Sequence, residues 1–497
     1  MLATALVLAA APACAQSWTW GSAVSGRETV TNNVNLESSE TRQSDWVTEL
    51  TPSLHVTERG ARTSLEGTLS VPIVLYARNG GNNAVYPSAD LLGDVRLIGD
   101  IFHVEGQVSV AQQFFNPFGA QPLGFENVTQ NRYQTSTYRV SPYAKGITPG
   151  RVSYEVRNDN VWTDLSGAPI ATSNFRYTAV NAKLSDVESV YGWQAEADYN
   201  DTDYYNAGST TRTALVRGIG VYTPDPQLRL SARVGYEENH FPLQDQSNAI
   251  YGAGFDWRPT ARAKAHGFWE HRYFGPSYLL SLENRMPLTV WNVRLSRNVT
   301  TYPQALANLP AGADVSALLN QIYQATIPDP TERQQTIDQF IRDRGLPPTL
   351  TSALSLYSQQ ILLQESQSAS VGLLGVRNTV LLTIFNVRSE PIAPSGNALP
   401  PTLAGATNNR QTGASVLWSH KFTPSLVLDT TIDRFRTVAN EPFEGKTNQT
   451  AARIVLSSPL SAKTTVFAGA RYQTLNSDVA FDYNETAAFI GFTHTFR

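Results

Sequence analysis

The chain has 497 residues, a formal net charge of −4 and one cysteine. A charge this near neutral excludes the basic footprint of a nucleic-acid-binding protein, and one cysteine excludes a disulfide framework. After residue 16 no apolar run approaches the roughly 20 residues that a membrane helix needs, which excludes a helical membrane protein.

The first 15 residues have the pattern of an export signal. Residues 2–11 are a short apolar core, and Ala13, Cys14 and Ala15 form a small-residue cleavage site, although no basic residues precede the core. We therefore predict a signal peptide at 1–15 and Sec-type export. Cleavage after Ala15 would remove the only thiol, and with it any cysteine-based metal site.

The chain that follows alternates with period two, the pattern of strands with one apolar face. Between 102 and 110, for example, Phe102 and Val104 alternate with His103 and Glu105. A slip of one residue would turn both polar side chains to lipid, where a charge at the bilayer midplane costs roughly 2 to 4 kcal/mol. The pattern therefore predicts that His103 and Glu105 point inward.

Short proline-containing turns and long polar connections alternate between these segments. Proline suits a tight turn because it lacks a backbone donor. The pattern predicts an all-β fold: a single transmembrane antiparallel β-barrel of about 22 strands, within a range of 20 to 24. Fifteen strands would lie in 16–302 and seven in 366–497, with both termini on the short-turn, periplasmic side. Aromatic residues near strand ends would form interfacial girdles, namely Trp20, Trp193, Trp257, Trp291, Trp418, Tyr76 and Tyr222.

Residues 303–365 break the strand pattern and change to a helical period. Asp329, Pro330 and Glu332 read as an N-cap, a first-turn proline and a capping-box acid, and Gly345 is a helix stop. Apolar stripes accompany these signals, with members Leu318, Leu319, Ile322, Phe340, Ile341, Leu354 and Ile361. We predict a small helical insert on the extracellular or lumen side. It would plug the barrel or, alternatively, form a cap above the rim.

The last stretch, 485–497, resembles the sorting signal of bacterial outer-membrane barrels. Gly491 and Phe492 precede a near-terminal aromatic residue, Phe496, although His494 and Arg497 depart from the pattern. These features predict assembly in the outer membrane by the barrel-assembly machinery.

Local catalytic, phosphate-binding and dinucleotide-binding motifs are not found. His266 and His271 approach a metal motif, but five residues apart in a strand they face opposite sides. We predict no metal site, no cofactor, no catalytic residues and no enzymatic activity. An outer-membrane hydrolase with dispersed catalytic groups is the alternative, for which the seven histidines are the candidates.

The face opposite the lipid-facing one predicts the lumen wall. Basic residues outnumber acidic ones along one arc of it, and the predicted basic members are Arg151, Arg157, Arg217, Arg229, Arg233, Arg262, Lys264, Arg272 and Arg294. One interpretation is a hydrated wall of mixed charge. The other is a surface for anionic sugars or phosphates, because arginine presents forked donors that fit carboxylates.

Several stretches of the chain also resemble a family of outer-membrane β-barrel proteins associated with exosortase (PEP-CTERM) systems. They begin at Glu28, Ser44, Val108, Tyr138, Ile327 and Leu373, and they read ETVTNNVNL, SDWVTELTPSLHV, VSVAQQFFNPFGAQP, YRVSPY, IPDPTERQQTIDQFIRDRGLP and LLGVRNTVLLTIFNVRSE. The resemblance spans most of the chain. It implies an outer-membrane location and genes near exopolysaccharide loci, but no activity.

These observations leave competing functions. The first is a non-enzymatic pore or assembly component linked to exopolysaccharide and exosortase systems. The alternative is a general diffusion porin or small-solute channel. The expected partners are outer-membrane lipid and the barrel-assembly machinery, with anionic polysaccharide or export components as further candidates.

Overall fold

The computed structural model describes residues 17–167, 174–186, 190–205, 209–242, 244–307, 360–392 and 406–496, together with single residues between 316 and 337. The predicted signal peptide at 1–15 lies outside these residues, as does most of the predicted insert. None of the helices in this part of the chain has the length and apolar character of a membrane span.

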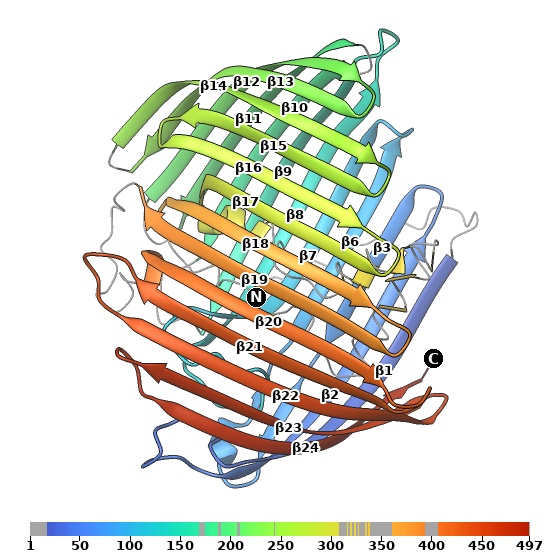
Figure 1. Ribbon diagram of the computed structural model, residues 1–497, viewed down its shortest axis with the longest axis vertical. Helices are drawn as coiled ribbons and strands as arrows, with labels where there is room; N and C mark the ends of the chain where they lie inside the picture. Colours follow the sequence, from blue (N-terminus) through green and yellow to red (C-terminus); the bar gives the residue numbers. More distant parts are fainter. Residues whose placement is uncertain are drawn as a thin grey trace.

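The chain forms one antiparallel sheet that closes on itself (Figure 1). Closure is made by β1, which pairs with both β2 and the last strand, β24. The strands are β1 (Ser17–Thr31), β2 (Asp45–Arg59), β3 (Thr63–Ser70), β4 (Ile73–Tyr76), β5 (Ala84–Val85), β6 (Ser88–Ile98), β7 (Phe102–Phe114), β8 (Arg132–Ile147), β9 (Ser153–Ser166), β10 (Phe175–Asp186), β11 (Tyr191–Tyr204), β12 (Ser209–Asp225), β13 (Leu228–Phe241), β14 (Gln244–Thr260), β15 (Ala263–Arg272), β16 (Gly275–Arg285), β17 (Thr289–Thr300), β18 (Leu362–Leu374), β19 (Asn378–Pro391), β20 (Asn409–Lys421), β21 (Val427–Ala439), β22 (Lys446–Ser461), β23 (Thr464–Ser477) and β24 (Tyr483–Thr495).

Two barrel strands are each interrupted once. β3 and β4 both pair with β2 and are separated by Val71 and Pro72, so they are two pieces of one strand. β5 and β6 pair with β4 and β3 respectively, and they form a second interrupted strand around Pro87. The 24 segments therefore make 22 barrel strands, which confirms the predicted closed barrel. Fifteen precede residue 301 and seven follow residue 361.

The two rims differ in their connections. Both ends of the barrel chain lie on one rim, here called the turn rim, where the strands are joined by two to five residues. The opposite rim, here called the loop rim, carries the long connections 32–44, 115–131, 301–361 and 392–408. This asymmetry is the one that single-chain outer-membrane barrels show.

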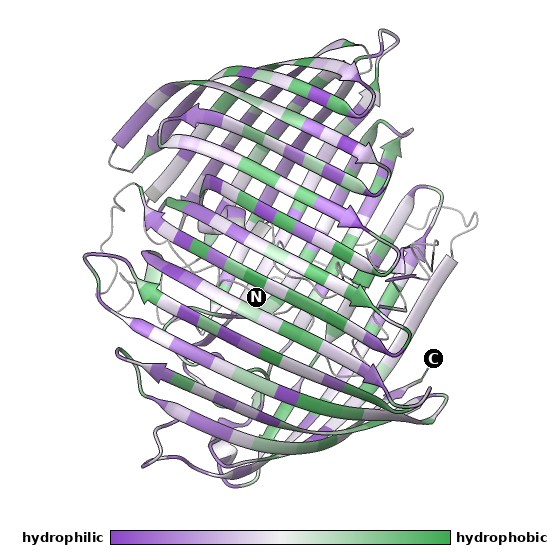
Figure 2. Cartoon of the chain, viewed as in Figure 1, coloured by the Kyte–Doolittle hydropathy of each residue, from purple (hydrophilic) through white to green (hydrophobic). Residues whose placement is uncertain are grey.

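Apolar and polar residues alternate along the strands (Figure 2). His103 and Glu105 lie on the inner face as predicted, where His103 bonds Asp94 and Glu105 pairs with Arg139. The predicted girdle residues Trp20, Trp193, Trp257, Trp291, Trp418 and Tyr222 are exposed near strand ends. For Tyr76 the prediction is wrong. Only 5% of this residue is exposed, because its side chain points inward and its hydroxyl donates to the Phe125 carbonyl.

The connection between β17 and β18 spans residues 301–361, so it begins two residues and ends four residues before the predicted bounds of 303–365. For residues 362–365 the prediction of an insert is wrong, because they are the first residues of β18. A short helix, α1 (Tyr302–Ala307), opens the connection. Thr301 caps this helix through its hydroxyl, and the Gln304 side chain returns a bond to the Thr301 amide, which is a capping box. The predicted cap at 329–332 and stop at 345 lie outside the described residues.

Candidate functional site

The connection 115–131, here called the inner loop, folds from the loop rim into the barrel. It joins β7 and β8, yet Thr437 of β21 donates to the Pro117 carbonyl and Gln449 of β22 donates to the Gln121 carbonyl at 2.7 Å. Several strands separate β21 and β22 from β7 around the barrel. The inner loop therefore crosses the lumen and packs on the wall where the two chain ends meet.

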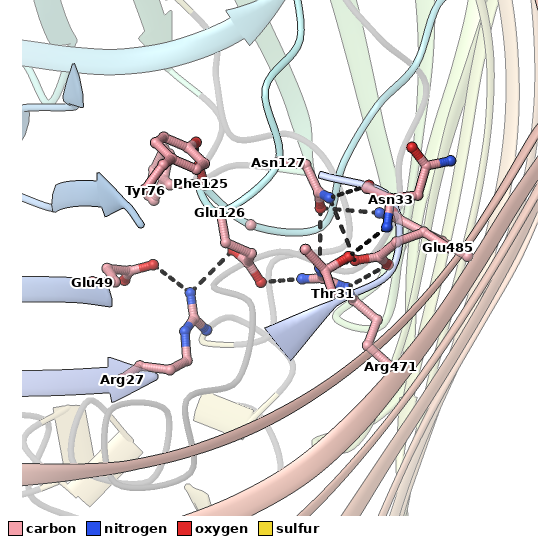
Figure 3. Close-up of polar contacts among 12 residues, drawn as sticks. Arg27, Thr31, Asn33, Glu49, Tyr76, Phe125, Glu126, Asn127, Arg471 and Glu485 are labelled. Atoms are coloured by element: carbon pink, nitrogen blue, oxygen red, sulfur yellow. Dashed lines mark hydrogen bonds and ion pairs between the residues drawn. The ribbon is translucent and has the colours of Figure 1, made fainter. Parts of the chain in front are cut away.

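Glu126 anchors this loop to the wall (Figure 3). Its carboxylate lies between two guanidinium groups, forming ion pairs with Arg471 of β23 and with Arg27 of β1 at 3.2 Å. Arg471 also pairs with Glu485 of β24 at 2.6 Å, and Arg27 pairs with Glu49 of β2. The chain of charges Glu49, Arg27, Glu126, Arg471 and Glu485, here called the anchor network, thus links the loop to four adjacent strands.

The central members of the anchor network are buried, so breaking the network is expected to destabilise the fold. Glu485 is 0% exposed, Glu126 2% and Arg471 3%. Burial alone would raise the pKa of the Glu126 carboxyl, but the charges of Arg27 and Arg471 outweigh it and hold that pKa well below its usual range. Glu126 is therefore ionised throughout the physiological range. Removing one partner of a buried pair leaves an uncompensated charge, which costs about 3 to 5 kcal/mol.

Neutral side chains complete the anchor. Asn127 accepts a hydrogen bond from Arg471 at 3.0 Å and another from Gln473 at 3.1 Å, and it donates to the Asn33 carbonyl. On the other side of the loop, Phe125 stacks on Tyr86 with ring centroids 5.0 Å apart. Because both charged and aromatic contacts hold its conformation, the inner loop is a fixed structural element inside the barrel.

Arginines on the opposite wall are also paired, and four of the nine predicted basic residues belong to these pairs. Arg157 contacts Glu105 at 2.5 Å, and Arg272 contacts Glu237 at 2.5 Å. Arg217 and Arg233 share Glu270, at 2.6 and 3.1 Å. This part of the wall is thus a ladder of opposite charges.

The other five predicted basic residues divide into two groups. Arg229, Lys264 and Arg294 stand on the inner face, are exposed, and form no ion pair with any residue that the structure describes. Arg151 and Arg262 lie in turns of the turn rim, and for them the prediction of a place on the strand wall is wrong. Strand ends shift by a residue or two with turn geometry, which alternation alone does not determine.

The insert touches both ends of the lumen through its described residues. Near the loop rim, the Tyr302 and Tyr133 hydroxyls bond at 2.6 Å. At the turn rim, Arg285, the last residue of β16, donates to the Gln324 side chain at 2.5 Å. Gln324 thus lies at the rim opposite the one from which the insert leaves. Leu319, a member of a predicted apolar stripe, is 0% exposed.

The three predicted sorting residues lie on or directly after β24, next to β1. The β24–β1 junction that closes the barrel is here called the seam. Phe492 and Phe496 are exposed on the outer face, and the Phe496 amide bonds to the Ser22 carbonyl. Gly491 faces inward, where an added Cβ would come within 2.5 Å of both the Gly26 carbonyl and the Phe467 ring. A packing reason therefore accounts for this glycine. The role of the three residues as a sorting signal stays a prediction.

Sequence reasoning missed the anchor network. Its members lie on strands β1, β2, β23 and β24 and on a loop, so no local motif joins them. His266 and His271 lie on opposite faces, as their spacing predicts: His266 bonds Asp256 inside, and His271 stacks on the outward Tyr251. In the part of the chain that the structure describes, no group of three or more potential metal ligands is present.

No protein-family model and no curated protein matches the sequence. Among solved structures, the chain is similar to OpdK of Pseudomonas aeruginosa with vanillate, at 9% identity over 96% of this chain and 99% of that chain, with a TM-score of 0.36. It is also similar to a BenF-like porin of Pseudomonas fluorescens Pf-5, at 9% identity over 96% and 99%, with a TM-score of 0.38. A third similar structure is OccK2 (OpdF) of Pseudomonas aeruginosa in complex with glucuronate, at 9% identity over 97% of each chain, with a TM-score of 0.37. The likeness concerns the barrel fold alone.

Proposed function

We propose that this chain is an outer-membrane channel for small polar solutes, with a lumen narrowed by the inner loop and the insert. The location is supported by the exposed apolar outer face, the aromatic residues near strand ends and the contrast between the two rims. A barrel of 22 strands encloses a wide lumen, and such barrels are filled by internal segments.

One observation carries the proposal: the two halves of the inner wall differ in exposure. The inner loop buries the wall around β22, β23, β24 and β1, whereas Arg229, Lys264 and Arg294 remain exposed on β13, β15 and β17. These three lie nearer the turn rim, while Glu237 and Glu270, nearer the loop rim on β13 and β15, are buried in ion pairs. Exposed charged side chains inside a barrel border water. A polar path along the β13–β17 side is therefore the route that we assign to the solute.

The charges along this path point to weak ion selectivity. Glu283 of β16 is exposed on the same inner face as Arg229, Lys264 and Arg294, and Glu155 is exposed outside this path, on β9. Opposite charges alternate along the wall, so their fields largely cancel beyond a Debye length of about 8 Å at physiological ionic strength. This supports the mixed-charge interpretation of the wall over a surface dedicated to anions.

Planar-bilayer recording and liposome swelling test the proposal. The purified barrel should give discrete conductance steps, a reversal potential close to zero in a salt gradient, and swelling with small neutral sugars. A protein that inserts, shows the heat-modifiable mobility of a folded barrel, and yet gives neither steps nor swelling would contradict it. The association with exopolysaccharide and exosortase systems rests on resemblance alone and stays a prediction, for which recordings with acidic oligosaccharides are the test.

A further inference from the structure

Five polar residues form one row across the inner wall. The strand register aligns Arg229 of β13 with Asp256 of β14, Asp256 with His266 of β15, His266 with Ser281 of β16, and Ser281 with Arg294 of β17. All five face the lumen, and none is buried. Directly opposed residues have Cβ atoms about 4.5 to 5.5 Å apart, so neighbouring side chains of the row lie side by side. Among them, His266 and Asp256 form a hydrogen bond.

The imidazole of His266 is held in a defined orientation. Its Nδ1 lies 2.6 Å from Oδ1 of Asp256, so Nδ1 carries the proton that the carboxylate accepts. The other nitrogen, Nε2, points away from Asp256 and forms no hydrogen bond to any described residue. A neutral imidazole fixed in this way presents a lone pair to the lumen, which is what a general base needs.

His103 shows what a structural histidine in this barrel looks like. Its Nδ1 also contacts an aspartate, Asp94, at 3.1 Å, but its Nε2 contacts the Asp100 carbonyl at 3.2 Å. Its ring is stacked on Tyr143 and buried. Both nitrogens of His103 are therefore used by the fold, whereas one nitrogen of His266 is left for another partner.

Ser281 and Arg294 continue the row beyond His266. Ser281 is the directly opposed residue on β16, the strand on the side of His266 away from Asp256. Arg294 follows on β17, exposed and without an ion pair to any described residue, and its guanidinium has five N–H donors. The order acid, imidazole, hydroxyl is the order of the groups in a serine hydrolase. Arg294 would supply hydrogen-bond donors for the oxyanion, which backbone N–H groups supply in that template.

We propose that this row is a hydrolytic site for carboxylic esters of small polar solutes that enter the lumen. Ser281 Oγ attacks the ester carbonyl carbon while its proton passes to His266 Nε2, and Arg294 stabilises the oxyanion. The bond to the alcohol oxygen then breaks, and the departing alkoxide takes the proton from His266. A water molecule then attacks the acyl carbon of acyl-Ser281 while its proton passes to His266 Nε2. The bond from that carbon to Ser281 Oγ breaks, Oγ takes the proton back from His266, and the acid is released. Asp256 acts as a positioning residue.

Active-site labelling tests the proposal on the full-length folded barrel. A fluorophosphonate probe should label Ser281, located by peptide mass spectrometry, and a p-nitrophenyl ester should be hydrolysed. Ser281→Ala should abolish the labelling, and His266→Ala should lower both labelling and hydrolysis by at least about 100-fold. Arg294→Met should lower kcat by about 100-fold or more, as removal of an oxyanion donor does.

Ser368 supplies the matched control, because it faces Arg294 from the other side, on β18. Ser368→Ala should leave labelling and hydrolysis unchanged. Asp256→Asn should lower kcat with KM unaffected, and Asp256→Glu should restore part of the loss. Wild-type barrel that is not labelled at Ser281, or that hydrolyses the ester as fast as Ser281→Ala, would overturn the proposal. Conductance is expected to be the same in wild type and Ser281→Ala, so loss of the hydrolytic site and loss of the channel are told apart.

Discussion

The two halves of the inner wall use charge differently. Around the seam, Arg471 and Glu485 are buried under the inner loop, and their charges are compensated by the anchor network. Across the lumen, Arg229 and Arg294 stand on β13 and β17 with exposed side chains and no ion pair among the described residues. The same residue type thus fixes a loop on one wall and borders the lumen on the other.

This difference shows that the role of a charged residue on the inner wall depends on whether another segment of the chain buries it. A buried pair is costly to break because the remaining charge has lost both water and partner. An exposed charge contributes little to stability but acts on any solute that passes. We therefore expect substitutions at the seam to change folding and pore width, and substitutions on the side formed by β13 to β17, here called the open wall, to change selectivity.

The largest change should follow removal of the insert. Replacing residues 304–360 by a short Gly/Ser loop leaves β18 intact and deletes Gln324, which accepts a hydrogen bond from Arg285 at the turn rim. If the insert narrows the lumen, single-channel conductance should rise several-fold, and cells should become sensitive to large antibiotics. A variant that inserts normally with unaltered conductance would show that the insert is a cap outside the conducting path.

Arg471→Met tests the seam directly. It leaves Glu126 and Glu485 buried without their common partner, so the free energy of unfolding in urea at pH 7 should fall by about 3 to 5 kcal/mol. The matched control is Arg229→Met on the open wall. There the free energy of unfolding is expected to change by no more than about 0.5 kcal/mol. Equal effects at the two positions would remove the distinction between the walls.

Glu126→Gln sharpens the comparison through pH. The pKa of Glu126 is lower in the folded barrel than in the unfolded chain, so its carboxylate stabilises the fold fully above the ordinary glutamate pKa of about 4.3. That contribution is lost as pH falls through the folded pKa. The free energy of unfolding of wild type should therefore exceed that of the variant by about 2 kcal/mol between pH 7 and 5. This difference should begin to narrow near pH 4 and shrink further as the pH approaches the folded pKa.

Thermal or urea unfolding at stepped pH values measures this gap, with Glu283→Gln on the open wall as the control that shows none. A gap that stays constant down to pH 3 would mean that the charge of Glu126 does not stabilise the loop.

Phe496→Ala tests the outer face of the same seam, and here we expect the smallest effect on the folded molecule. Phe496 is half exposed and packs edge-on against His494, so the assembled barrel should lose little stability. If the terminal aromatic is read during assembly, the amount of folded protein in the outer membrane should fall while unfolded chain collects in the periplasm. Gel mobility with and without heating measures both, and an unchanged yield would argue against a signal.

The barrel itself followed from the sequence because alternation and turn spacing act locally. The number of strands, the inward direction of His103 and Glu105 and the rim asymmetry all depend on neighbours within one hairpin. The anchor network could not follow from that logic. Glu126 meets Arg471 across 345 positions, and only the closure of the barrel brings β23 beside the seam.

The row at Asp256, His266 and Ser281 is an intermediate case. Local spacing gave no hint of it, since the three residues lie 10 and 15 positions apart. The register is nevertheless set by two short turns, and the two-residue turn at Tyr273 and Phe274 fixes Arg272 opposite Gly275 and so Ser281 opposite His266. Exact turn positions would have revealed the row, whereas alternation alone did not.

The most direct test of the account is thiol accessibility inside the lumen. In a Cys14→Ser background, Arg294→Cys and Gln473→Cys place one thiol on the exposed wall and one on a residue that is 0% exposed beneath the inner loop. A charged thiol reagent added during bilayer recording should modify Cys at 294 and change the conductance at once. The thiol at 473 should react at least about 100-fold more slowly. This ratio corresponds to a free energy of about 2.8 kcal/mol for the local opening that exposes the thiol. Equal rates at the two positions would contradict a lumen divided into a covered wall and an open one.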